Sequence, residues 1–157
     1  GAIASSPIQK ASPAPQTEEK AREIYIGTFD MERLRELLTV ARAFGKAKHL
    51  PYLDALDREL TVARISKPRE VPPDLVTMNS RVRLKNIHTG QDRICFLVFP
   101  KDRESRDENV SILEPMGTAM IGHRTGSIFN VETADTRESW MIEQILYQPE
   151  AAGDFHL

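Results

Sequence analysis

The sequence predicts an α+β protein in which a short antiparallel helical hairpin, of coiled-coil type, precedes an antiparallel sheet with one short helix against it. The spacing of the apolar residues predicts this class. They recur every three to four positions as far as Ala63, which is typical of amphipathic helices, and alternate with polar residues after Leu75, which is typical of strands. Between the two patterns, the proline-rich segment SKPREVPPD (66–74) favours a linker.

We therefore predict three parts in the chain: a flexible extension over residues 1–22, the helical hairpin over residues 23–68 and the sheet over residues 74–157. Residues 1–20 are rich in Ser, Ala, Pro and Gln and have few bulky apolar side chains, so burial cannot offset the entropy that ordering them would cost. The remaining length suffices for one or two compact units.

The hairpin is expected to begin with a short extended run over residues 23–27, and its first helix is predicted over residues 29–43. Thr28 is expected to cap this helix. Asp30 lies in the predicted first turn, where a carboxylate is favourable because it faces the positive end of the helix dipole. Gly45 is expected to end the helix.

The second helix is predicted to open at Pro51, because the first turn of a helix does not need a proline's missing N–H, and the arm is expected to end at Ser66. Both helices carry leucine-rich stripes at helical spacing. We expect the two stripes to be hidden against each other, which predicts a helical hairpin.

The tip of the hairpin, FGKAKHLPY (44–52), combines basic and apolar side chains. Lys46, Lys48 and His49 lie at this tip, and Asp54 follows in the next turn, where a carboxylate is expected to serve the helix dipole. One interpretation of the tip is a solvated loop. The other is a probe on a rigid stalk that is placed into a partner. The residues themselves leave both interpretations open.

Strands are predicted around Val82 and Leu84 and over residues 93–99, 110–113, 127–131 and 140–147. The charged residues 101–109 are expected to form a solvated loop. A brief helix on the sheet is predicted over residues 115–121, since Pro115 suits a first turn.

The segment EPMGTAMIGHRTG (114–126) contains three closely spaced glycines, which raises the question of a phosphate-binding loop. Such a loop needs a Lys and a Ser or Thr directly after its last glycine, and this segment has no Lys. We therefore favour structural roles: Gly117 and Gly122 for close packing of the short helix, and Gly126 for the turn into the next strand.

No catalytic, cofactor or metal site is predicted, because the four histidines lack paired ligand spacing, Cys95 is expected to be buried in a strand, and the serines lack a GxSxG turn. A net charge of −2 disfavours strong direct binding to nucleic acid. The chain has no apolar run of membrane-spanning length, no secretory leader and no second Cys, so we expect no membrane partner and a cytoplasmic location.

Three segments carry a family resemblance: VTMNSRVRLKN (76–86), EPMGTAMIGHRTGS (114–127) and YQPEAAGDFHL (147–157). Together they resemble the Rnk family, the regulators of nucleoside diphosphate kinase, which are relatives of the bacterial Gre transcript-cleavage factors. The resemblance covers about residues 23–157. The last segment is typical of the Rnk-like branch. The second is shared with Gre proteins, with Ser127 where they usually have Asp.

The resemblance implies an N-terminal coiled coil and a C-terminal domain of FKBP-like fold, which docks at the secondary channel of RNA polymerase and lets the coiled coil enter it. At the tip of Gre factors, an Asp and a Glu help to hold a catalytic Mg²⁺ that cleaves backtracked RNA. Lys46 and His49 stand at those positions here, on a shorter hairpin. The resemblance therefore implies a non-enzymatic regulator that competes with Gre factors without stimulating cleavage and influences nucleoside diphosphate kinase levels, with no cofactor and no small-molecule substrate.

Leu113, Glu114, Pro115 and Met116 stand where Gre proteins have their polymerase-docking loop, so the resemblance implies that this surface binds the polymerase. Two alternatives stay open. One is a peptidyl-prolyl isomerase, which the FKBP-like resemblance suggests, although an aromatic content of 6% is low for the aromatic-lined pocket that such an enzyme needs. The other is a general protein-interaction module.

Overall fold

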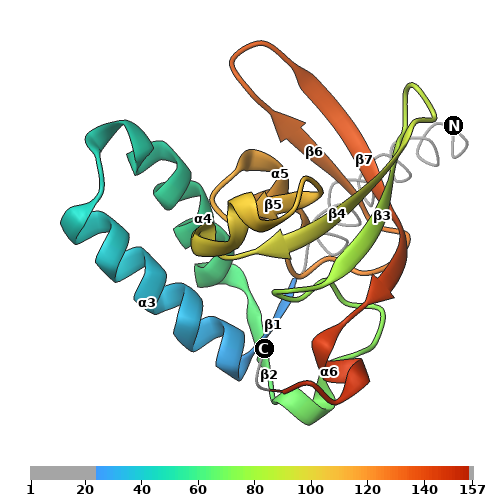
Figure 1. The fold of residues 1–157 in the computed structure, drawn as a ribbon, viewed down its shortest axis with the longest axis horizontal. Helices are drawn as coiled ribbons and strands as arrows, with labels where there is room; N and C mark the ends of the chain where they lie inside the picture. The colour runs from blue at the N-terminus through green and yellow to red at the C-terminus, as the bar shows by residue number, and fades with distance from the viewer. Residues whose placement is uncertain (1–23, 156–157) are drawn as a thin grey trace, which may run out of the picture.

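A computed structural model describes residues 24–155 and shows a helical hairpin beside a five-stranded sheet (Figure 1). The extension predicted over residues 1–22 lies outside the described residues. Within residues 24–155, the helical hairpin precedes the five-stranded sheet along the chain, which confirms the α+β class. None of the described helices is long and apolar enough to cross a membrane.

The hairpin consists of α3 (Thr28–Phe44), the 3₁₀ turn η2 (Ala47–His49) and α4 (Leu50–Val62). Its 17-residue and 13-residue helices are about 26 Å and about 20 Å long at 1.5 Å per residue. Gly45 ends α3 as predicted: its N–H donates to Ala41 O at 2.7 Å and its backbone turns to an extended conformation. Pro51 lies in the first turn of α4, also as predicted.

The base of the hairpin differs from the prediction. The residue before α3 is Gly27, and the Thr28 hydroxyl donates to Ser66 O at 3.2 Å instead of capping the helix. The second arm does not continue as a helix to Ser66, because residues after Val62 form the strand β2 (Arg64–Ser66), which pairs in parallel with β1 (Tyr25–Gly27). This two-stranded sheet ties the ends of the hairpin together.

The larger sheet has the strand order β5-β4-β3-β7-β6. Its strands are β3 (Arg81–Asn86), β4 (Asp92–Val98), β5 (Asn109–Ser111), β6 (Ile128–Glu132) and β7 (Arg137–Tyr147). The prediction of a wholly antiparallel sheet is wrong, because β5 runs parallel to β4. The charged segment after β4, predicted as a loop, contains the 3₁₀ helix η4 (Pro100–Ser105). This segment is a crossover that returns the chain to the end of the sheet at which β4 begins, so β5 runs in the same direction as β4.

Along the chain, short helices precede the strands of the large sheet, lie between two of them and follow the last one. The predicted brief helix is present as α5 (Pro115–Met120). The 3₁₀ helix η3 (Pro68–Glu70) lies in the linker, and α6 (Pro149–Ala152) follows β7. Gly117 allows α5 to approach β5 closely, since a Cβ there would lie 2.1 Å from Ser111 O. Gly122 has a φ of +77°, and a Cβ there would lie 2.8 Å from the Cβ of Ile24. The structural roles predicted for these two glycines are confirmed.

One hydrophobic core joins the hairpin to the sheet. Leu34 of α3 and Leu56 of α4 belong to the same buried cluster as Leu97 of β4, Met120 of α5 and Trp140 of β7. The expectation that the two helical stripes are hidden only against each other is therefore wrong: α4 also packs against α5. Complete burial of each such side chain contributes about 1.5–3 kcal/mol, so the orientation of the hairpin is stabilised by the core as well as by the linker.

Candidate functional site

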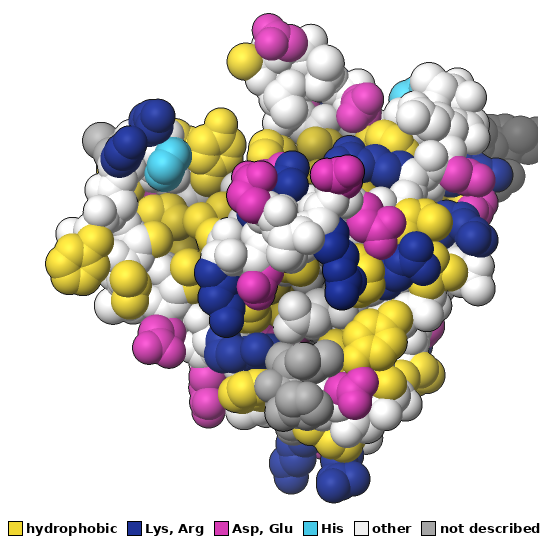
Figure 2. Space-filling view, in the orientation of Figure 1, with side chains coloured by type: hydrophobic (Ala, Val, Ile, Leu, Met, Phe, Trp, Pro, Cys, Tyr) yellow, Lys and Arg dark blue, Asp and Glu magenta, His cyan; other side chains and the backbone are white. Residues whose placement is uncertain are grey.

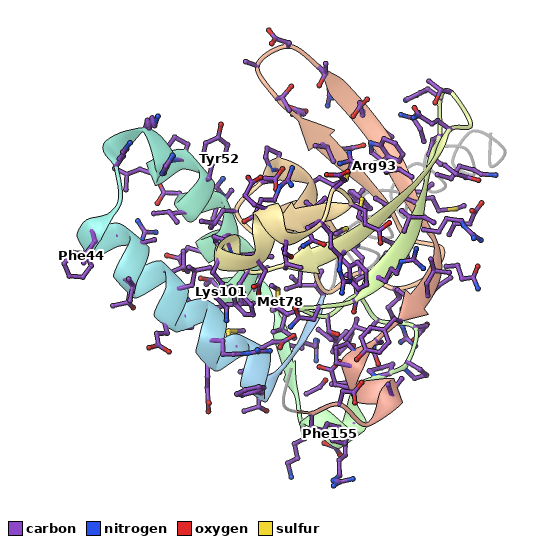
Figure 3. All side chains as sticks on the ribbon, viewed as in Figure 1. Phe44, Tyr52, Met78, Arg93, Lys101 and Phe155 are labelled. Carbon is purple, nitrogen blue, oxygen red and sulfur yellow. The ribbon has the colours of Figure 1, made fainter. Side chains whose placement is uncertain are left out.

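The tip of the hairpin projects from the body with its basic and aromatic side chains exposed. Phe44 is 86% exposed and Tyr52 is 45% exposed, and Figure 3 shows both side chains directed away from the hairpin. Lys46, Lys48 and His49 are also exposed. Figure 2 shows basic side chains beside a histidine at this end of the molecule. An exposed Phe at the end of a helix contributes little to folding, so the tip presents a surface that can contact a partner.

The carboxylates nearest to the tip are held by arginines of the opposite helix. Asp54 Oδ1 lies 3.0 Å from Arg42 Nη2, and Asp57 lies 3.1 Å from Arg42 Nη2 and 2.7 Å from Arg35 Nη1. The hydrogen bond from Arg35 lowers the pKa of Asp57. These pairs join α3 to α4 beside the tip, so Asp54, which was predicted with the tip, lies in α4 and takes part in the contact between the helices.

The predicted docking loop lies where β5 ends and α5 begins. Glu114 precedes α5, and its Oε2 accepts hydrogen bonds from Arg103 Nε at 2.7 Å and from Ser111 N at 2.6 Å. Pro115 is the first residue of α5, and Leu113 is partly buried against the core. Met116 is only 7% exposed, so its side chain belongs to the core and can shape a docking surface only by positioning α5.

A buried carboxylate, that of Asp30, connects the hairpin to the sheet, and the sequence patterns did not predict this contact. Asp30 is 3% exposed, and its oxygens accept hydrogen bonds from Met78 N at 2.9 Å and from Arg33 Nη2 at 2.6 Å. Burial raises the pKa of Asp30 to about 6, and the bond from Met78 opposes this rise. Asp30 lies in the first turn of α3, as predicted, but its carboxylate also bonds to the backbone of Met78, a contact that the sequence did not predict. The available signal was the spacing of Asp30, Leu34 and Leu38, which share one face of α3.

Arg33 reaches across the same junction. Its guanidinium lies 4.1 Å from the ring centroid of Phe29 on α3 and 4.9 Å from that of Phe99, which follows β4. Such cation–π contacts contribute about 0.5–2 kcal/mol each, more when they are shielded from water. Together with the hydrogen bond between Asp30 and Met78, they fix the first turn of α3 against the sheet.

The C-terminal segment YQPEAAGD (147–154) closes over the base of the hairpin. Gln148 is 3% exposed, and its Nε2 donates to the carbonyl oxygens of Pro72 and Leu75, each at 2.7 Å. Thr77 Oγ1 donates to Glu150 Oε1 at 2.7 Å. A small cavity of about 10 Å³ is lined by Gly27 and Asp30 together with Pro149 and Glu150, so α6 lies near the base of the hairpin, on the side of β1 and β2 away from the helices (Figure 1). The motif is thus a structural clasp.

Comparison with known proteins agrees with this architecture. A family model described as "Rnk N-terminus" matches residues 22–65, and one described as "Transcription elongation factor, GreA/GreB, C-term" matches residues 71–147. The regulator of nucleoside diphosphate kinase of Escherichia coli (strain K12) is 37% identical over 135 residues, which cover 85% of this chain and 96% of that protein. The transcription elongation factor GreA of Syntrophomonas wolfei is 28% identical over 115 residues, which cover 64% of this chain and 72% of that protein.

A solved structure has a similar fold over most of the chain. The prokaryotic transcription elongation factor GreA/GreB from Nitrosomonas europaea superposes with a TM-score of 0.66 and 32% identity, covering 80% of this chain and all of that chain. The N-terminal match, the C-terminal match and the identity along nearly the whole length of the Escherichia coli regulator agree with one another. The chain therefore belongs to the Rnk family of regulators of nucleoside diphosphate kinase, which is related to the GreA/GreB elongation factors.

Proposed function

We propose that this protein is a non-enzymatic regulator of transcription that binds RNA polymerase at its secondary channel and competes there with Gre factors without stimulating transcript cleavage. Through transcription, it would influence the level of nucleoside diphosphate kinase. The observation that carries the proposal is a helical hairpin on a GreA/GreB-related body whose exposed tip presents Lys46, Lys48 and His49 and no unpaired carboxylate among its described residues.

The chemistry of the tip explains the expected lack of cleavage activity. Mg²⁺ is a hard cation that takes oxygen ligands, chiefly from carboxylates. An ammonium group such as that of Lys46 cannot coordinate it. Asp54 and Asp57 are bound to Arg42 and Arg35, and releasing them would break the pairs that join α3 to α4. The tip can therefore occupy a channel but lacks the groups to assemble a magnesium site there.

Docking is proposed at the loop before α5, where Leu113, Glu114 and Pro115 reach the surface. Glu114 has a dual role in this proposal, because the same carboxylate that faces a partner also accepts the hydrogen bonds from Arg103 and Ser111. The loop is thus held in one conformation before binding, which lowers the entropy cost of association.

A peptidyl-prolyl isomerase function is not favoured. An isomerase of FKBP-like fold would need an open aromatic-lined pocket between the short helix and the sheet. Here that space is filled: Met116 and Met120 of α5 and Trp140 and Ile142 of β7 are all buried in the common core. A substrate proline could enter only if this core opened.

The proposal is tested with purified core RNA polymerase and a fluorescently labelled Gre factor. We expect the protein to displace the labelled factor, and to leave the rate of RNA cleavage in backtracked complexes at the level of polymerase alone. Robust cleavage on adding the protein would contradict the proposal, as would the absence of displacement at saturating concentrations.

Charge-reversed variants locate the docking surface. Glu114→Lys is expected to weaken displacement of the Gre factor at least tenfold, since it replaces an attractive contact with a repulsive one. Glu132→Lys is the matched control, because Glu132 also forms an exposed pair with an arginine, Arg137 at 3.0 Å, but lies on β6 at the opposite edge of the sheet. Equal affinities for the two variants would place the docking surface elsewhere. Circular dichroism checks that both fold.

A further inference from the structure

A groove lies on the outer face of the sheet, the face opposite to α5. Side chains alternate along β4: Cys95 and Leu97 are buried in the core with the α5 methionines, so Phe96 and Val98 lie on the other face. There, Phe96, Val98 and Tyr147 form apolar walls of a groove of about 410 Å³, and residues of η4 and of the segment after it form its polar side. None of the residues that line this groove has a role in the proposed function.

Asn109, which lines the groove, has a fully buried side-chain oxygen that lacks a donor among the described residues. Asn109 is 3% exposed, and its Nδ2 donates to Asp102 O at 2.8 Å and to Ser105 Oγ at 2.9 Å. Its Oδ1 accepts no hydrogen bond from any of the described residues. Buried amide oxygens are almost always satisfied, and the exceptions call for an explanation. Asp102 and Ser105 line the same groove, whose polar side is therefore rich in acceptors.

The mouth of the groove carries a cation held over an aromatic ring. The guanidinium of Arg106 is exposed and lies 4.8 Å from the ring centroid of Phe96, and it forms no ion pair within residues 24–155. Arg81, at 5.8 Å from the same centroid, is already paired with Glu108 at 3.0 Å. Arg106 is therefore the group in the groove that can accept a carboxylate without first breaking another ion pair.

These features suit a peptide better than a nucleotide. An extended peptide can place an apolar side chain against Phe96, Val98 and Tyr147, direct a carboxylate to Arg106 and offer a backbone N–H to the carboxylate of Asp102. A phosphate carries up to about twice the charge of a carboxylate at neutral pH, so the Asp102 carboxylate that lines the same groove opposes it more strongly.

The groove is continuous with the proposed docking loop through η4. Arg103 of η4 binds Glu114 of that loop at 2.7 Å, while Asp102 and Ser105 of the same turn line the groove. We infer that the groove is a second contact surface for RNA polymerase and that it takes a polymerase segment in which an acidic residue lies next to an apolar one. This inference rests on the proposed function, since it extends the same docking surface.

The test compares full-length variants in binding to core RNA polymerase. Arg106→Glu is expected to lower the affinity about tenfold, because it replaces an ion pair with a repulsion. Arg93→Glu is the matched control: Arg93 is an exposed arginine on the same strand as Phe96 but does not line the groove, and its affinity is expected to stay within twofold of that of the wild-type chain. In addition, a photo-crosslinking p-benzoylphenylalanine at Ser105 is expected to label a polymerase segment with an Asp or Glu beside an apolar residue.

The outcomes separate this inference from the proposed function. If the wild-type chain does not bind the polymerase, the proposed function fails and the groove inference fails with it. If the wild-type chain binds, Glu114→Lys weakens binding and Arg106→Glu does not, only the groove inference is overturned. A crosslink from Ser105 to nucleic acid instead of polymerase also overturns it. Equal losses for Arg106→Glu and Arg93→Glu would mean that the effect is a general charge effect, which contradicts a specific contact.

Discussion

Asp30 is as deeply buried on α3 as the leucines that share its face of the helix. Its carboxylate joins the first turn of the hairpin to the backbone of Met78, and burial shifts its pKa upward to about 6 from an ordinary 3.8. The folded protein therefore binds a proton more tightly here than the unfolded chain does. Because the folded pKa is the higher one, this residue stabilises the fold most at low pH and loses that contribution as pH rises.

The pH dependence of stability tests this account. As the pH rises from about 3 to about 7, the free energy of unfolding of the wild-type chain is expected to fall by about 3 kcal/mol relative to that of Asp30→Asn, with about 2 kcal/mol of this change between pH 4 and pH 6, since a pKa difference of one unit corresponds to about 1.4 kcal/mol. Above about pH 7 the difference should stay constant. Urea denaturation at several pH values measures it. Parallel curves for the two proteins over pH 4–6 would contradict the raised pKa.

Among the elements, the C-terminal clasp, residues 147–154, forms hydrogen bonds with segments that lie far away along the chain. Residues 147–154 contribute one short helix, yet their side chains bind the linker at Pro72 and Leu75 and the loop at Thr77. Gln148 has the central position in the clasp. Its Nε2 donates to the carbonyl oxygens of Pro72 and Leu75, and its Oε1 accepts a hydrogen bond from Ala151 N of α6. The clasp therefore fixes where the hairpin joins the sheet.

Removing this side chain is expected to destabilise the protein. Gln148→Ala leaves the buried carbonyl oxygen of Leu75 without the donor it has here and leaves Pro72 O with Leu75 N alone, which costs about 1–3 kcal/mol in the free energy of unfolding. Gln144→Ala, on the preceding strand β7, is the control. The Gln144 side chain is exposed and accepts only a hydrogen bond from Arg83, so the change in the free energy of unfolding should stay within about 0.5 kcal/mol. Chemical denaturation of both variants measures the change in the free energy of unfolding. Equal changes for the two variants would contradict a structural role for Gln148.

In the whole molecule, the hairpin and the sheet share one hydrophobic core. The division into a hairpin over residues 23–68 and a sheet unit over residues 74–157 remains a proposal about the organisation of the chain. The shared core nonetheless has a thermodynamic consequence. Elements that share one core expose its side chains to water together when they unfold. The hairpin and the sheet should therefore unfold in one cooperative transition.

Two probes can test this cooperativity. Trp140 is the only tryptophan and reports on the sheet, while far-ultraviolet circular dichroism reports chiefly on the helices. Leu56→Ala on α4 should cost about 2–5 kcal/mol and shift both transitions to the same lower midpoint. Val62→Ala, at a position that is 69% exposed, should shift neither by much. If the Trp140 transition stays in place while the helical signal moves, the hairpin unfolds separately and the shared core does not couple them.

The helices, most strands and the residues that end or open them could be predicted from the sequence alone. These features depend on local patterns: the spacing of apolar residues, Gly45 after α3, Pro51 in α4 and Pro115 at α5. The exposed tip with Lys46 was also readable, because its composition differs from that of the helices on either side. The resemblance to a family added the docking loop, whose role stays a prediction.

How these elements are joined depends on contacts between parts of the chain that are distant in sequence. A three-residue strand such as β2 is too short to show a period, and the parallel direction of β5 follows from the crossover through η4. The burial of Asp30 depends on Met78, a partner that lies far away in the chain. The side-chain oxygen of Asn109 lacks a donor in the described part of the chain because of the residues that pack around it. Local patterns record which side of an element is apolar, whereas the identity of the neighbour across each contact is set only when all the elements are packed together.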